Sequence, residues 1–135
     1  MKTRHTLTLA ITLGVLALVQ SCVNAPHLKP GYVPPEEAVN AYLDSLRWQE
    51  YDEAKASVAP SAQPAFDNFR RENEGRLNLV DYKIRDVEMR DNTYTAVVKI
   101  RRSYFKVPSV SKQTQEITQT WKLIDGKWYL SGPPF

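Results

Sequence analysis

The stretch Trp121-Lys122-Leu123-Ile124-Asp125-Gly126-Lys127-Trp128-Tyr129-Leu130 decides the fold of this chain. Apolar and polar residues alternate on both sides of Asp125-Gly126, a dipeptide typical of the two-residue turn between antiparallel strands. The alternation extends back along the chain, so that Ile117, Gln119, Trp121 and Leu123 share one face of the first of these strands, which is apolar except at Gln119. We interpret Trp121 as a core residue, and Trp128 and Tyr129 as one packed and one partly exposed strand residue.

Two further strands are expected before this hairpin, over residues 80–89 and 94–105, joined by a turn at Asp91-Asn92. The first strand has an inner face of Val80, Tyr82 and Ile84. A one-residue slip of its alternation at Asp86 predicts a β-bulge. The second strand has one apolar face, made of Tyr94, Ala96, Val98 and Ile100. Strands joined by short turns in this way make an antiparallel meander.

Residues 36–74 have a helical period instead. Apolar residues recur three and four positions apart, which predicts helices over about 36–48 and 50–58 and a third from Ser61 or Gln63 to Glu74. The third helix is expected to turn three residues inward, namely Ala65, Phe66 and Phe69. Because helices come first and strands afterwards, we predict an α+β domain in which N-terminal helices pack on a curved antiparallel meander sheet.

This order of elements and the ending over residues 121–130 resemble the nuclear transport factor 2-like superfamily, also called cystatin-like. The resemblance covers about residues 36–131. It implies a strongly curved sheet that wraps the helices into a cone, whose mouth can hold a ligand. The superfamily is common among small bacterial lipoproteins of unknown function. It includes isomerases, dehydratases, cyclases, binding proteins and dimerisation modules, so the resemblance implies a fold and leaves the function open.

The first residues of the chain have the pattern of an export signal. Lys2 and Arg4 precede an apolar run over residues 7–19. This run is shorter than the roughly 20 residues that a transmembrane helix needs. It ends in Val19-Gln20-Ser21-Cys22, which resembles the lipobox of bacterial lipoproteins.

The lipobox resemblance implies cleavage between Ser21 and Cys22 and lipidation of Cys22 with acyl chains such as palmitate. We therefore predict a signal peptide over residues 1–21, a lipidated Cys22 with a Pro-rich tether over 22–35, and a single domain over 36–135. The alternative is an ordinary secretory signal with an incidental thiol, although an unpaired thiol is a liability in an oxidising compartment. The expected location is the cell envelope, at the periplasmic face of the outer membrane, because Val23 follows the cysteine instead of aspartate.

Removal of the signal changes the charge argument. The formal net charge of +3 comes from 18 basic and 15 acidic residues, and Lys2 and Arg4 are among the basic ones. The chain from Cys22 onward therefore carries 16 basic residues against 15 acidic ones. Nucleic-acid binding needs a strongly basic domain with clustered charge, so we expect no nucleic-acid partner.

The sequence offers little for catalysis. The only histidine after Cys22 is His27, in the tether, and the chain has no Cys/His cluster, P-loop or G-x-G-x-x-G motif. We therefore assign no catalytic residue, no metal site and no cofactor. The alternative is a small cone-fold enzyme, isomerase- or dehydratase-like, that uses a carboxylate base. Its candidate residues are Tyr42, Tyr82, Tyr94 and a nearby Asp.

One surface feature points to a partner. No acidic residue lies between positions 99 and 112, a segment that contains Lys99, Arg101, Arg102, Lys106 and Lys112. The first four are predicted to contact an anionic partner, such as a lipid headgroup, an acidic glycan or a protein. The alternative is a solvated strand whose cations guard a sheet edge against pairing.

Together these features predict a lipid-anchored envelope protein with a non-catalytic binding or accessory domain. Its expected partner is an envelope protein or a small amphipathic ligand. A homodimer through the outer face of the sheet is a further alternative.

Overall fold

The computed structural model describes residues 33–135 as helices followed by strands. The helical half contains α1 (Glu36–Arg47), α2 (Tyr51–Ala56), the single-turn helix η1 (Pro60–Ala62) and α3 (Gln63–Asn73). The strands are β1 (Leu77–Arg90), β2 (Thr95–Lys106), β3 (Gln113–Ile124) and β4 (Lys127–Leu130), with the single-turn helix η2 (Asp91–Thr93) between β1 and β2. The predicted α+β architecture is confirmed.

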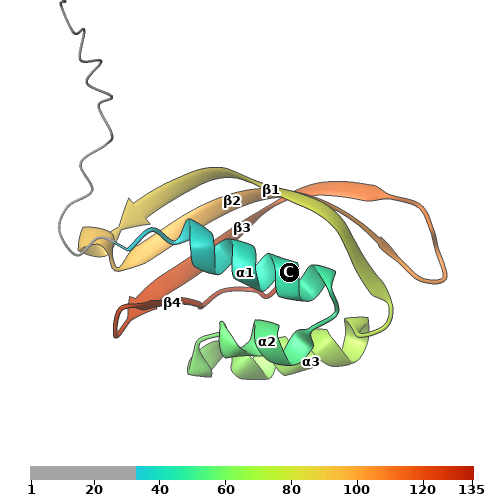
Figure 1. Cartoon of the computed structure of the whole chain (residues 1–135), viewed down its shortest axis with the longest axis horizontal. Helices are drawn as coiled ribbons and strands as arrows, with labels where there is room; N and C mark the ends of the chain where they lie inside the picture. The colour runs from blue at the N-terminus through green and yellow to red at the C-terminus, as the bar shows by residue number, and fades with distance from the viewer. Residues whose placement is uncertain (1–32) are drawn as a thin grey trace, which may run out of the picture.

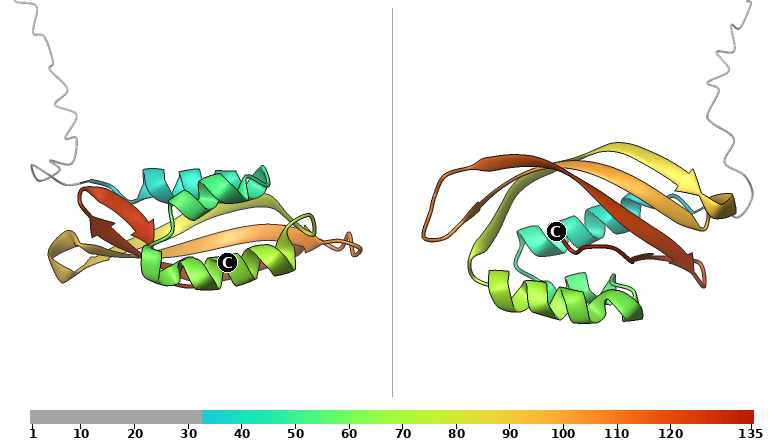
Figure 2. Two further views of the ribbon diagram at one scale, coloured as in Figure 1. Left: turned by 90° about the horizontal axis from the view of Figure 1, so that it is seen from below. Right: turned by 180° about the vertical axis from the view of Figure 1, so that it is seen from behind.

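The strands form one antiparallel sheet in the order β1-β2-β3-β4, which is the predicted meander. The sheet arches over α1, and α2 and α3 lie farther from it on the same side (Figure 1). The right-hand view of Figure 2 shows from behind that no helix covers the opposite face of the sheet. The domain therefore has a concave face filled by helices and a convex face open to solvent.

Helix α1 anchors the core. Glu36 and Glu37 begin it, where carboxylates interact favourably with the positive end of the helix dipole. Its apolar residues recur on one face, and four of them are buried, namely Val39, Tyr42, Leu43 and Leu46. They pack against inward residues of the sheet, which include Ala96, Val98, Ile100 and Trp121. The ring of Tyr42 stands edge-on to Trp121, with 5.8 Å between the ring centroids.

Strand β1 contains two β-bulges. The register slips between Ile84 and Asp86, which confirms the predicted bulge, and slips also between Leu79 and Asp81. This second bulge turns Val80 outward and brings Leu79 to the core, so the predicted inward position of Val80 is wrong. The position of a bulge depends on pairing with the neighbouring strand, and this pairing cannot be inferred from the alternation of residues within one strand.

Two other apolar residues lie on the surface instead of in the core. Tyr94 precedes β2 and is 61% exposed, because residues 91–93 all have positive φ and end the alternation before the strand begins. Ala65 lies on the exposed side of α3. The helix begins at Gln63, after η1, and Ser61 makes no capping hydrogen bond.

The hairpin that decided the fold is present as predicted. Asp125 and Gly126 have φ values of 50° and 77°, which is the left-handed pair that a type I′ turn requires. Trp121 is fully buried, Trp128 is buried and Tyr129 is half-buried, as expected.

The domain begins just before α1. Val33, which the sequence places in the tether, already contacts the domain, since the indole Nε1 of Trp128 donates a 2.8 Å hydrogen bond to its carbonyl oxygen. The predicted signal peptide, Cys22 and the tether up to residue 32 lie outside the described residues. Within residues 33–135, no helix has the length and apolar character needed to cross a bilayer.

Candidate functional site

The predicted basic residues of β2 are divided between the two faces of the sheet. Lys99 and Arg101 are exposed on the convex face, where Lys99 lies 3.4 Å from a carboxylate oxygen of Asp86. Arg102 is only 4% exposed and lies on the concave face with Ile100. Lys106 is exposed at the end of β2, paired with Leu77. The four residues therefore do not form one surface, because neighbouring residues of a strand point to opposite faces.

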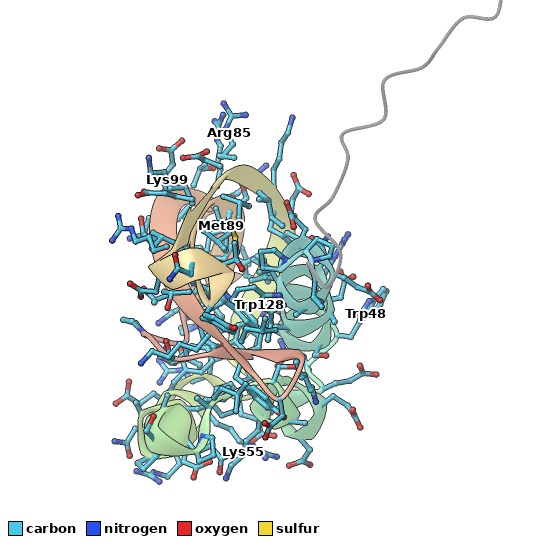
Figure 3. The ribbon with its side chains drawn as sticks, turned by 90° about the vertical axis from the view of Figure 1, so that its left-hand side faces the viewer. Trp48, Lys55, Arg85, Met89, Lys99 and Trp128 are labelled. Carbon is cyan, nitrogen blue, oxygen red and sulfur yellow. The ribbon has the colours of Figure 1, made fainter. Side chains whose placement is uncertain are left out.

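Arg101 joins a different set of cations on the convex face. β1 pairs with β2 so that Lys83 lies beside Arg101, and Arg85 follows at the bulge. With Lys112 they line a groove of about 390 Å³, which we call the outer groove; its other lining residues are Asp81, Ser103 and Thr114. Figure 3 shows Arg85 and Lys99 on the part of the domain farthest from Lys55 of α2.

The outer groove is positively charged. Four cations line it against the single carboxylate of Asp81. Glu116 lies opposite Arg101 on β3 but is not a lining residue and forms no ion pair with it among residues 33–135. The hydroxyl groups of Ser103 and Thr114 lie 3.0 Å apart and add polar contacts to the groove. Guanidinium and ammonium groups brought together in this way favour an anionic ligand.

Sequence reasoning missed Lys83 and Arg85 as members of this group. Both alternate with the inward residues Tyr82 and Ile84, so their outward direction could be inferred. Their position beside Arg101 depends on the strand register, which is set by the two bulges of β1.

Arg102 has an unusual position inside the concave face. Its Nη2 donates a 3.0 Å hydrogen bond to the side-chain oxygen of Gln115. Its Nε and Nη1 are buried and have no acceptor among the described residues. Cζ lies 3.2 Å from the centroid of the Phe135 ring. Burial lowers the pKa of Arg102 to about 10, because the charged form is poorly solvated there.

The alternative catalytic set does not assemble in the cone. Tyr42 is buried and its hydroxyl donates to the carbonyl oxygen of Pro134 at 2.6 Å. Tyr82 is half-buried and donates to the carbonyl oxygen of Asn40 at 3.3 Å, while Tyr94 lies outside. Burial raises the pKa of Tyr42 well above its ordinary value and that of Tyr82 to about 12.

A carboxylate base inside the cone is also missing from the described part of the chain. No Asp or Glu between residues 33 and 135 belongs to the buried class. Phe66 and Trp121 are fully buried and fill the interior that a substrate would need. Within the same residues, no group of His, Cys, Asp and Glu side chains is placed to hold a metal ion.

Comparison with known proteins identifies the fold. No protein-family model and no curated protein matches the chain. Solved structures do match it, among them a SEC-C motif containing protein from Rhodopseudomonas palustris, with a TM-score of 0.62 and 13% identity over 73% of this chain and 75% of that one.

Two other solved structures also match the chain. One is an NTF-2 like protein of unknown function from Shewanella oneidensis, with a TM-score of 0.54 and 14% identity over 71% of this chain and 90% of that one. The other is a ketosteroid isomerase-like protein from Erwinia carotovora atroseptica, with a TM-score of 0.56 and 11% identity over 71% and 87%. The nuclear transport factor 2-like fold predicted from the sequence is confirmed. At these identities the likeness concerns the fold alone, and it is shared by proteins of different function.

Proposed function

We propose that this chain, a domain of the nuclear transport factor 2-like fold, is a lipid-anchored and non-catalytic binding protein of the cell envelope. In this proposal the outer groove binds an acidic segment of another envelope protein. The observation that carries it is the convergence of Lys83, Arg85, Arg101 and Lys112 on the open face of the sheet.

The anchor is supported by the sequence around Cys22. A cleaved signal followed by a diacylglyceryl cysteine would hold the domain at a membrane surface through several acyl chains, which is enough for stable attachment. The tether over residues 23–32 would span at most about 30 Å as an extended Pro-rich chain. Partners within that distance of the bilayer are therefore the relevant ones.

The non-catalytic role is supported by the character of the interior. General acid or base catalysis near neutral pH needs a titratable group whose pKa is tuned by burial. The buried polar side chains of residues 33–135 are Asn73, Arg102 and Gln119, and none of them is a carboxylic acid or an imidazole.

The groove is tested by pull-down of envelope proteins with the full lipoprotein. The triple variant Lys83→Gln, Arg85→Gln, Arg101→Gln is compared with Arg47→Gln, Arg76→Gln, Lys122→Gln, which removes three exposed cations outside the groove. The groove variant should lose at least about tenfold in recovery of its partner, and binding by the wild type should weaken with salt. The control variant should recover the partner like the wild type.

Other outcomes would identify another ligand or reject the groove. Equal recovery by both triple variants would reject the groove as the protein-binding site. Binding of anionic lipid vesicles or of an acidic glycan, lost in the groove variant only, would replace the protein partner by that ligand.

The anchor is tested separately. Metabolic labelling with a fatty acid should modify the wild-type protein, and Cys22→Ser should remain unlabelled and uncleaved. Mass spectrometry that places an unmodified Cys22 inside the mature chain would contradict the anchor.

A further inference from the structure

The last described residues, 131–135, form a strap across the concave face. The strap leaves β4 with two hydrogen bonds from Ser131 to the carbonyl oxygen of Thr120, at 2.8 Å from its backbone nitrogen and 3.1 Å from its hydroxyl. It then runs back between α1 and α3, and its end lies beside both helices in Figures 1 and 2. The ring of Phe135 lies 5.6 Å from that of Phe69 and 5.5 Å from that of Tyr104.

Side chains, and not a strand ladder, hold the strap in place. After Ser131, its hydrogen bonds to the described residues are made by the carbonyl oxygen of Pro134, which accepts from Tyr42 at 2.6 Å and from Gln119 at 3.4 Å. Pro133 and Pro134 have no N–H group to offer to the sheet. Phe135 is only half-buried. A segment with so few backbone hydrogen bonds can leave its place while the sheet stays intact.

Beneath the strap lies a cation with unused hydrogen-bonding capacity. Arg102 is 96% buried, and two of its three guanidinium nitrogens have no acceptor within residues 33–135. The aromatic rings of Phe135 and Tyr104 are its near neighbours, at 3.2 Å and 5.3 Å from Cζ to the centroids. Aromatic rings attract a guanidinium group but do not accept its N–H bonds as a carboxylate does. A buried cation of this kind is normally paired with an anion.

We propose that the strap is a displaceable cover over a binding site for an amphipathic anion. The anion replaces the side chain of Phe135, and Arg102 binds its acid group. The apolar body of this ligand would lie against Phe69 and Tyr104, where the ring of Phe135 lies now, and its acid group would accept hydrogen bonds from Arg102. The site is on the concave face, opposite the outer groove, so it goes beyond the proposed function.

The proposal is tested with decanoate and 1-decanol as probes, on the purified full chain. Phe135→Ala removes the ring that competes with the ligand and should increase the affinity for decanoate at least about tenfold over the wild type. Arg102→Met added to Phe135→Ala should reduce decanoate binding at least about tenfold, to the level of 1-decanol. Arg76→Met, which removes an exposed arginine outside both the strap site and the outer groove, should leave decanoate binding unchanged in the same background.

A second variant tests release of the strap independently, in case Phe135→Ala does not fold. Tyr42→Phe removes the hydrogen bond that holds Pro134 and should also increase decanoate affinity, by a few-fold. Cooperative unfolding of each variant confirms that it is folded. The proposal is overturned if neither strap variant binds decanoate more tightly than the wild type. It is also overturned if Arg102→Met leaves the preference for decanoate over 1-decanol unchanged.

Discussion

The hydroxyl of Tyr42, in the first helix, donates a 2.6 Å hydrogen bond to the carbonyl oxygen of Pro134, 92 residues later in the sequence. This contact joins α1 to the strap. Tyr42 also packs edge-on against Phe66 and Trp121, so one side chain connects the helical layer, the sheet and the last segment of the domain.

Loss of this hydroxyl should destabilise the domain. Tyr42→Phe keeps the ring and removes the donor, which leaves the carbonyl oxygen of Pro134 with only the long contact to Gln119. We expect the free energy of unfolding to fall by about 1–2 kcal/mol in urea denaturation. Tyr129→Phe is the matched control, because the Tyr129 hydroxyl has no hydrogen-bond partner within residues 33–135, and should change stability by less than about 0.5 kcal/mol. Equal losses in both variants would contradict the role of the Tyr42 bond.

Replacement of the buried arginine should have the opposite effect. Arg102→Met keeps much of the side-chain volume and removes a buried charge that has no anionic partner among the described residues. We expect the free energy of unfolding to rise by about 1–2 kcal/mol, measured by thermal and urea denaturation. Arg101→Met, on the exposed face of the same strand, should stay within about 0.5 kcal/mol of the wild type. A marked loss of stability in Arg102→Met would instead assign this residue a structural role.

The centre of the core should be sensitive to a cavity. Phe66 is fully buried, with its ring centroid 6.3 Å from that of Tyr42 and 5.8 Å from that of Phe69. Phe66→Ala should lower the free energy of unfolding by about 3–5 kcal/mol, because it removes apolar contact and leaves a void. Val110→Ala truncates a side chain that is 83% exposed and should cost no more than about 0.5 kcal/mol. A small effect of Phe66→Ala would mean that the interior collapses easily around the missing ring.

Alkaline pH should weaken the fold through Tyr82. Burial raises its pKa from 10.0 to about 12, so below pH 10 its contribution to stability is fully present. Between about pH 10 and 12 the unfolded chain loses the phenolic proton while the folded chain keeps it, so the free energy of unfolding falls as pH rises. Tyr82→Phe should therefore show a shallower fall than the wild type in urea denaturation over this window.

Comparison of Tyr82→Phe with the wild type isolates the contribution of the Tyr82 phenol to the pH dependence of stability. Burial lowers the pKa of Arg102 to about 10, so deprotonation of Arg102 in the folded chain makes the free energy of unfolding rise with pH above 10. This contribution is present in both proteins and cancels in the comparison. Tyrosinate absorbance, followed in the same titration, reports when the buried phenols ionise. Parallel pH profiles for Tyr82→Phe and the wild type would contradict the assignment.

Much of the fold followed from local pattern. The three α-helices, the bulge near Asp86 and the Asp125-Gly126 turn all lie where period and turn chemistry predicted them. The bulge between Leu79 and Asp81 could not be predicted, because it is defined by pairing with Tyr104 and Ser103 of another strand. Exposure of Tyr94 was missed for a similar reason, since three successive residues in the left-handed region shift the start of β2.

The candidate site was only partly accessible from sequence. The run of cations over residues 99–112 was visible, but it was treated as one contact surface. The structure separates the exposed Arg101 from the buried Arg102, because neighbouring residues of a strand point to opposite faces. The partners of Arg101 in the outer groove come from β1 and from the segment before β3, so they are brought together only by strand pairing.

By itself, the sequence determined the order of helices and strands and the side of the sheet that most residues face, because period and turn chemistry act over a few neighbouring positions. The tertiary structure decided which distant residues meet: four cations in the outer groove, and Phe135 over Arg102. These contacts depend on the register of the strands, on the two bulges of β1 and on the return of the strap to α1. All three are determined by packing between segments that are far apart in the chain.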